Sequence, residues 1–184
     1  MTHIAIDMDE VIVDFVGGLL GSINLEFGTE LTEADITEWD MGKVLDPIIG
    51  YSWWKWLKAR SWLWAQYQPV PGALGGIDKL HHAGHRLEIV TSKPKWARYT
   101  VWTWMGRYRP AVDGVTIVDV GQSKRESTDA RILIDDNWDN CMDWTEHGTN
   151  DGWAYLLDKP WNSGQRHMGI NRVSNWDDIL KEVL

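Results

Sequence analysis

A series of short, apolar, β-rich runs, separated by stretches long enough for a helix, is the feature that most constrains the fold. The runs occupy residues 3–7, 86–92, 115–120, 131–136 and 152–158. Runs of this length are typical of buried strands, and strands that alternate with helices favour a parallel sheet. We therefore predict an α/β fold with a parallel sheet and helices on both of its faces.

One region breaks this alternation. Residues 29–68 show no strand-like pattern and are dense in Trp, as in the run SWWKWLKARSWLWAQY. We interpret this stretch as part of a helical insertion. Pro and Gly in PVPGALGG mark the end of this insertion, after which strands and helices alternate again.

Helices are predicted by amphipathic spacing over residues 73–83, 93–109 and 175–184. In the second of these, apolar side chains recur at helical spacing and predict a face turned to the core: Ala97, Val101, Trp104 and Tyr108. The segment NSGQRHMGINR, residues 162–172, is predicted as a polar loop. Structural roles are expected near it for Asp158, Trp161 and Asn162.

Charge and composition exclude several classes of protein. The net charge of −9 repels nucleic-acid polymers. No apolar run approaches the roughly 18 residues that a membrane span needs. The single cysteine, Cys141, cannot form an intrachain disulfide, and MTHIAIDMDE lacks the basic region that opens a signal peptide. We expect a cytoplasmic protein that binds neither a nucleic-acid polymer nor a membrane.

Tryptophan is unusually frequent, with 14 among 184 residues. Most of these side chains are expected to pack in the core or between its parts. A few are candidates for a stacking surface that holds a flat ligand such as a nucleobase. The two roles are compatible in one chain.

Polar side chains follow the predicted strands at the points where the strands end. They are Asp7 and Asp9, Thr91 and Ser92, and Asp135 and Asp136, with Lys124 in the loop before the last pair. Ligands of open parallel sheets bind outside the carboxyl ends of the strands, so we expect these groups in one crevice. Carboxylates gathered there need a cation, and ligands that are all oxygen favour Mg²⁺. The pattern indicates phosphoryl transfer.

Four motifs in this order, IDMDEVIVDF, VTSKPK, SKRES and LIDDN, resemble those of haloacid dehalogenase-type phosphatases. The resemblance implies that Asp7 is the nucleophile, which forms an aspartyl-phosphate. It implies that Asp9 is the general acid/base and lends its backbone carbonyl to Mg²⁺. The implied phosphate-binding residues are Thr91, Ser92 and Lys124, and the implied metal site comprises Asp7, Asp9, Asp135 and Asp136. Which member of the last pair is the direct ligand stays open.

A closer resemblance is to the 5'(3')-deoxyribonucleotidases, the cytosolic type C 5'-nucleotidase family. It is carried by DMDEVIVDF, QPVPGAL, VTSKPK and LLDKPWN and spans nearly the whole chain. It implies a Rossmann-like core of residues 1–15 and 71–184, with a small helical cap, residues 16–70, inserted after the first strand and covering the site. It also implies aromatic contacts to a nucleobase. Phe15 is one candidate for this contact, with a core role as the alternative, and the cap offers Trp53, Trp54 and Trp62.

Three assignments near the motifs have alternatives. Arg125 competes with Lys124 for the role of the basic loop residue. Lys93 and Lys95 belong to a basic stretch that we interpret as a solvated helix face, with phosphate contact as the alternative. Glu10 stands where many relatives have Gly and is expected to add negative charge near the mouth of the site.

The expected function is Mg²⁺-dependent hydrolysis of (deoxy)ribonucleoside monophosphates to nucleoside and phosphate. The alternative is a related phosphatase that acts on another small phosphate ester, such as a sugar phosphate. A signalling receiver domain fits less well, because it needs a lone acceptor Asp on a middle strand and lacks an insertion. An inactive fold that binds a partner through its cap is opposed by the complete set of acids. A homodimer stays open as the oligomeric state.

Overall fold

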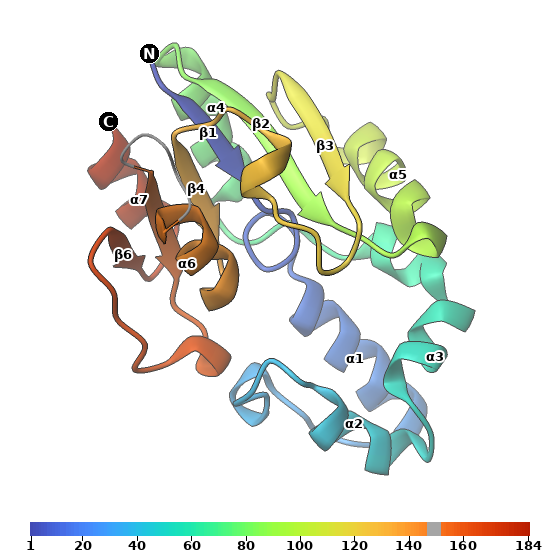
Figure 1. The fold of residues 1–184 in the computed structure, drawn as a ribbon. Coiled ribbons are helices and arrows are strands. Elements are labelled where there is room, and N and C mark those ends of the chain that lie inside the picture. The colour runs from blue at the N-terminus through green and yellow to red at the C-terminus, as the bar shows by residue number, and fades with distance from the viewer. Residues whose placement is uncertain (147–151) are drawn as a thin grey trace.

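The computed structural model describes residues 1–146 and 152–184, and within them one sheet of six parallel strands in the order β3-β2-β1-β4-β5-β6 (Figure 1). The strands are β1 (His3–Ile6), β2 (Arg86–Ser92), β3 (Gly114–Val118), β4 (Ile132–Asp135), β5 (Trp153–Leu157) and β6 (Ile170–Val173). Every pairing between neighbours is parallel. The α/β Rossmann-like prediction is therefore confirmed, and the predicted strands lie within two residues of the observed ones.

β6 corrects the prediction of a polar loop at 162–172. It pairs in parallel with β5, with Ala154 opposite Ile170 and Leu157 opposite Val173. Within β6 only the two outer residues, Ile170 and Val173, are buried. Its middle residues, Asn171 and Arg172, are polar because β6 lies at the edge of the sheet. Such a strand lacks the apolar run that marks a buried one.

The helices are α1 (Phe15–Phe27), α2 (Gly42–Ile49), α3 (Trp53–Ala59), α4 (Ala73–His82), α5 (Arg98–Tyr108), α6 (Trp138–Glu146) and α7 (Trp176–Val183). α6 was not among the predicted helices. None of the helices that the structure describes combines the length and the apolar character that crossing a bilayer requires.

α5 begins at Arg98, later than the predicted start at residue 93. The backbone N–H of Lys93 donates to the carbonyl of Val118 at 3.1 Å, so this residue continues the pairing of β2 with β3. Pro94 is extended, and a short 3₁₀ helix, Lys95–Ala97, precedes α5. A residue before proline is disfavoured in helical conformation, which keeps Lys93 out of the helix. The predicted core-facing stripe of α5 is confirmed at Val101 and Trp104, which are fully buried.

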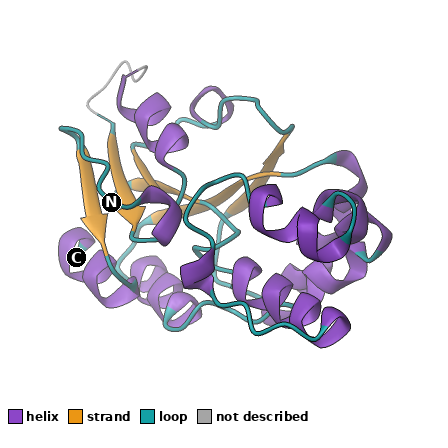
Figure 2. Ribbon diagram, turned by 90° about the horizontal axis from the view of Figure 1, so that it is seen from below, coloured by secondary structure: helices purple, strands orange, loops and turns teal. Residues whose placement is uncertain are grey.

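Alternate strand residues face two separate hydrophobic clusters. Ile4 and Ile6 of β1 belong to the larger cluster, which also holds buried residues of α1, α4, α5 and α7. Ala5 belongs to the smaller one, which includes Cys141 and Trp144 of α6. Figure 2 shows helices on both sides of the sheet. This two-layer covering leaves the carboxyl ends of the strands free to form a site.

The mostly helical segment 16–70, called the insertion below, lies beyond those carboxyl ends. Figure 1 shows α1, α2 and α3 past the arrowheads of β1 and β2. A 3₁₀ helix at its end, Ser61–Gln66, contacts both α1 and α5. The insertion is thereby placed opposite the strand ends that carry the polar residues.

Two adjacent glycines of α4 provide a matched test of packing. A Cβ at Gly76 would collide with the ring of Trp176, which is fixed by a 2.8 Å hydrogen bond from Nε1 to the carbonyl of Val11. At Gly75 a Cβ would meet open space. We expect Gly75→Ala to raise the free energy of unfolding by about 0.5–1 kcal/mol, through helix propensity. Gly76→Ala is expected to lower it by about 1–3 kcal/mol through overpacking. Urea denaturation measures both, and shifts of the same sign would contradict the assignment.

Candidate active site

The loop after β1 brings two acids to the edge of the sheet. The backbone N–H of Asp7 donates to the carbonyl of Ile134 at 2.9 Å, which continues the β1–β4 pairing. The carbonyl of Met8 then accepts hydrogen bonds from Ile12 (2.9 Å) and Val13 (2.8 Å) and closes a tight turn. As a result Asp7 and Asp9 both line the cavity beyond the strand ends.

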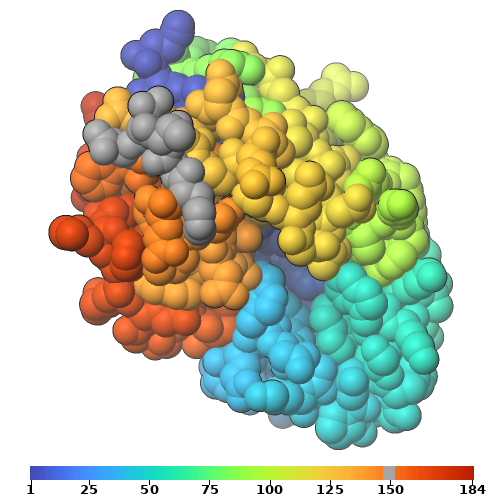
Figure 3. Space-filling model, in the orientation of Figure 1, coloured from blue at the N-terminus to red at the C-terminus, as the bar shows by residue number. Residues whose placement is uncertain are grey.

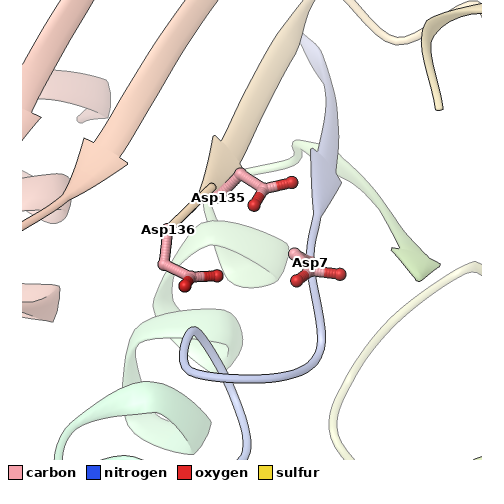
Figure 4. A group of neighbouring side chains, drawn as sticks. All are labelled: Asp7, Asp135 and Asp136. Atoms are coloured by element: carbon pink, nitrogen blue, oxygen red, sulfur yellow. The ribbon is translucent and has the colours of Figure 1, made fainter. Parts of the chain in front are cut away.

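Three buried carboxylates meet in this crevice. Ligand atoms of Asp7, Asp135 and Asp136 all lie within 4.8 Å of one another. Figure 4 shows the three side chains, carried by the ends of β1 and β4, turned toward a common space. Nζ of Lys124 lies 2.7 Å from Oδ1 of Asp7 and 2.7 Å from Oδ2 of Asp135. One buried ammonium therefore faces three buried acids.

The charge of this cluster is only partly balanced. Burial raises the pKa of Asp135 to about 6, although Lys124 opposes the shift. Burial, followed by the charges of Asp135 and Asp7, raises the pKa of Asp136 well above its ordinary value. A cation among these oxygens would offset both effects, and an all-oxygen donor set fits a hard divalent ion such as Mg²⁺. The residues present thus fit a metal site.

The two neighbouring acids on β4 have different surroundings. Asp135 accepts hydrogen bonds from Lys124 (2.7 Å), from the backbone of Asn137 (2.8 Å) and from Nδ2 of Asn140 (3.0 Å). Asp136 lines the cavity and accepts a 2.9 Å hydrogen bond from Nε1 of Trp161. The sequence offered only a structural role for Trp161, because nothing local links it to an acid 25 positions earlier.

The carboxylate of Asp9 lies outside the three-acid group and has its own partners. Nε1 of Trp64 donates to its Oδ1 at 2.9 Å, and Nζ of Lys93 donates to its Oδ2. Lys93 is fully buried, which corrects the interpretation of this residue as part of a solvated helix face. Burial raises the pKa of Asp9, while the charge of Lys93 opposes the shift.

The structure also shows where the basic loop residue and the hydroxyl groups of Thr91 and Ser92 lie. Lys124, not Arg125, contacts the acids. The guanidinium of Arg125 donates a 2.8 Å hydrogen bond to the carbonyl of Ala130 and lies over the ring of Trp144. At the end of β2, Thr91 is buried, and Ser92 lines the cavity with its Oγ donating to the carbonyl of Asp119 at 3.2 Å.

A cavity of about 480 Å³ opens onto the acids. In Figure 3 this face is hollowed where the insertion meets the core. Phe15, Trp53 and Trp54, which the sequence offered as candidates for contact with a nucleobase, line the cavity, whereas Trp62 is exposed and is not part of its lining. Further aromatic lining residues, which the sequence did not single out, are Trp39, Trp64 and Trp161. The rings of Phe15 and Trp64 pack with centroids 4.7 Å apart.

Glu10 joins the site to the insertion. Its φ of 62° lies in the left-handed region, which a non-glycine residue rarely adopts. Its buried carboxylate accepts a hydrogen bond from the backbone of Val16, at the start of α1. Nζ of Lys159 lies 2.6 Å from Glu10 and 3.2 Å from Glu33 of the insertion. The expected negative charge at the site mouth is therefore largely paired.

Glu10 should make the stability of the metal-free protein depend on pH. Burial raises its pKa to about 7 from an ordinary 4.5, despite the opposing charge of Lys159. The folded state therefore holds the proton more tightly than the unfolded state, and this stabilisation is lost as the pH rises from about 4.5 to about 7. Glu10→Gln should remove this pH dependence, which amounts to on the order of 2 kcal/mol of unfolding free energy across the window.

Thermal unfolding of the metal-free protein across this pH window measures the effect. Glu33→Gln is the matched control, because it removes the partly exposed acid on the same lysine. An unchanged pH slope in Glu10→Gln would contradict the assignment.

Comparison with known proteins identifies the class of protein to which the chain belongs. The chain matched no curated protein. A provisionally named phosphoglycolate phosphatase from Lactobacillus delbrueckii subsp. bulgaricus shares 16% identity, with 100% of this chain and 99% of that chain covered and a TM-score of 0.70. A HAD hydrolase of family IA, variant 3, from Entamoeba histolytica shares 12% identity, with 100% and 97% covered and a TM-score of 0.63.

A D,D-heptose 1,7-bisphosphate phosphatase from B. bronchiseptica, complexed with magnesium and phosphate, shares 10% identity over 100% of this chain and 98% of that chain, with a TM-score of 0.56. These likenesses define a fold of the haloacid dehalogenase (HAD) type. The chain belongs to the family "5' nucleotidase, deoxy (Pyrimidine), cytosolic type C protein", whose family model matches residues 1–184. Family membership identifies a phosphatase, that is, a phosphoric monoester hydrolase.

Proposed function

We propose that the protein is a Mg²⁺-dependent phosphatase that hydrolyses (deoxy)ribonucleoside monophosphates to nucleoside and phosphate through an aspartyl-phosphate intermediate. The observation that carries the proposal is one cavity lined by two chemically different kinds of side chain. Acids and Lys124 line it together with the aromatic rings of Phe15 and five tryptophans. A nucleotide has the two matching groups, an anionic phosphate and a flat base.

The volume and the lining support a nucleotide-sized substrate. About 480 Å³ lies within the range of small-molecule sites. Trp53, Trp54 and Trp64 come from the insertion, so the proposed base contacts belong mainly to the cap and the phosphate contacts to the core. We accordingly propose residues 16–70 as the cap and residues 1–15 and 71–184 as the core.

Each residue near the acids has a proposed step. A carboxylate oxygen of Asp7 attacks phosphorus, the bond from phosphorus to the leaving oxygen breaks, and Asp9 gives that oxygen a proton. Asp9 then takes a proton from the water that hydrolyses the acyl phosphate. Lys124, with the hydroxyls of Thr91 and Ser92, is proposed to bind the phosphate oxygens.

The proposed metal ligands follow from the exposure of the acids to the cavity. Asp7 and Asp136 would hold the ion, with the backbone carbonyl of Asp9, because both carboxylates line the cavity. Asp135 is proposed to orient Lys124, since its oxygens already accept hydrogen bonds from that lysine and its neighbours. When bound, Mg²⁺ would neutralise phosphate charge in the transition state.

A small nucleotide is the proposed partner, and the cytoplasm is the proposed location, supported by the family description. The single cysteine, Cys141, is buried and free, as expected in a reducing compartment.

Phosphate release tests the function directly. A panel of deoxy- and ribonucleoside monophosphates and sugar phosphates is incubated with and without Mg²⁺, with Asp7→Asn as the blank. We expect Mg²⁺-dependent release that is faster from nucleotides than from sugar phosphates, since stacking on the aromatic walls adds about 1–3 kcal/mol for a base and nothing for a sugar. Among nucleotides we expect dUMP or dTMP to react fastest, in line with the family description. Release mainly from sugar phosphates would keep the catalytic assignment and reject the nucleotidase one.

A further inference from the structure

Asp9 is held between two parts of the chain that come together only in the folded protein. Its Oδ1 accepts a 2.9 Å hydrogen bond from Nε1 of Trp64, in the insertion. Its Oδ2 accepts from Nζ of Lys93, which follows β2 in the core. The two donors act on different oxygens, so the plane and the direction of this carboxylate are both constrained.

The two donors also support each other. Nζ of Lys93 lies 4.3 Å from the centroid of the Trp64 ring, within cation–π range. Lys93 is fully buried and Trp64 is 4% exposed, so both donors are shielded from solvent. Trp64 is packed further by Phe15, at 4.7 Å between centroids, and by Trp96 at 6.0 Å.

We infer that Lys93 and Trp64 are positioning residues that aim the carboxyl group of Asp9 at the leaving oxygen of the substrate, so that the insertion must be docked on the core before the proton can be delivered. The inference rests on the proposed function, in which Asp9 protonates that oxygen. A carboxylate oxygen offers two lone-pair sites, so each oxygen of Asp9 can keep its donor and still face a substrate. Trp64 thus has a role beyond lining the cavity.

The leaving group of the substrate separates this role from simple packing. A poor leaving group such as phenolate needs a proton as its bond to phosphorus breaks, whereas p-nitrophenolate departs without one. Misplacing Asp9 should therefore slow phenyl phosphate far more than p-nitrophenyl phosphate. The two esters have nearly the same shape, so a change in ring binding affects both alike.

The measured quantity is the ratio of kcat/KM for p-nitrophenyl phosphate to kcat/KM for phenyl phosphate, in the presence of Mg²⁺. Lys93→Met keeps an unbranched apolar stem, and Trp64→Phe keeps a ring without its N–H donor. We expect each variant to raise the ratio about tenfold, and Asp9→Asn to raise it at least as much, since a positioned acid contributes about 10²–10⁴-fold. Because both rates come from one preparation, a partly folded sample leaves the ratio unchanged.

Trp54→Phe is the matched control. Trp54 lines the same cavity and packs against Trp64, with centroids 6.2 Å apart, and its replacement leaves both donors to Asp9 in place. Its ratio should stay at the wild-type value. A ratio that rises in neither Lys93→Met nor Trp64→Phe, or in only one of them, would overturn the inference.

The possible failures are distinguishable. Hydrolysis of aryl phosphates by the wild type, with none of nucleotides, would reject the proposed substrate and leave the ratio test intact. Hydrolysis of nucleotides with an unchanged ratio in both variants would reject the positioning role alone. Absence of phosphate release from every ester would reject the proposed function and the inference together.

Discussion

Asp7→Asn is expected to abolish phosphate release, with a fall in kcat on the order of 10⁴-fold or more, as for the loss of a catalytic nucleophile. The side chain keeps its size, while the amide cannot attack phosphorus. Asp7 is one of three buried acids beside the ammonium of Lys124, which lies 2.7 Å from it, so removal of one negative charge should leave the fold intact. Release of phosphate from the preferred nucleotide, with circular dichroism of the same samples, measures both.

The matched control is Asp14→Asn in the same loop. Asp14 accepts a 3.0 Å hydrogen bond from the backbone of Gly17 and caps α1, and it does not line the main cavity. Since Asn and Asp cap helices almost equally well, stability should change by only about 0.5 kcal/mol or less. Its kcat should stay close to that of the wild type. Equal losses in the two variants would mean that Asp7 matters through the loop and not through its chemistry.

Lys124→Met is expected to cost both stability and activity. Its side chain is 3% exposed and its ammonium lies between Asp7 and Asp135, so its removal leaves these buried acids without the cation they share. Breaking one side of a buried ion pair typically costs about 3–5 kcal/mol of unfolding free energy, and we expect this loss in metal-free protein. Phosphate release should fall about 10²–10³-fold, as for loss of one charge-stabilising donor.

Urea denaturation with and without Mg²⁺ tests whether the loss of stability in Lys124→Met comes from the missing positive charge. A cation that binds the folded state stabilises it by mass action, so Mg²⁺ should restore part of the lost stability. The neighbour Arg125 is the control, since it contacts Ala130 and Trp144 and not the acids. Arg125→Met should cost about 1 kcal/mol. A smaller loss of stability in Lys124→Met than in Arg125→Met would refute the proposed balance of charge.

The core of the fold was predictable because its signals are local. Runs such as RLEIVTS, residues 86–92, are apolar and β-branched over the whole length of a strand, and β2 occupies those same residues. The prediction failed at β6, where the edge position allows Asn171 and Arg172 in the middle of a four-residue strand. It also misplaced the start of α5, because Lys93 continues the sheet pairing before Pro94.

The acids of the site were predictable for a related reason. Asp7 and Asp136 follow strands of a parallel sheet and Asp135 is the last residue of one, and such strand ends meet at one edge. The structure brings these three together as expected. Lys124 was preferred to Arg125 from the motif, and its contacts agree with that choice.

The partners of Asp9 show what sequence alone could not supply. Trp64 lies 55 positions from Asp9 and Lys93 lies 84 positions away, and neither spacing carries a local signal. In the sequence Lys93 is one of several basic residues, and Trp64 is one of 14 tryptophans. Only the packing of the insertion against the core selects them.

By itself, the sequence determined the parallel sheet, the acids at its carboxyl edge and the family, because periodicity and short motifs are properties of neighbouring residues. The tertiary structure alone decided that Lys93 is buried, that Trp64 and Trp161 donate to acids lining the cavity, and that Lys159 joins the core to the insertion. These contacts join distant segments, and their geometry is set by how the insertion docks over the strand ends.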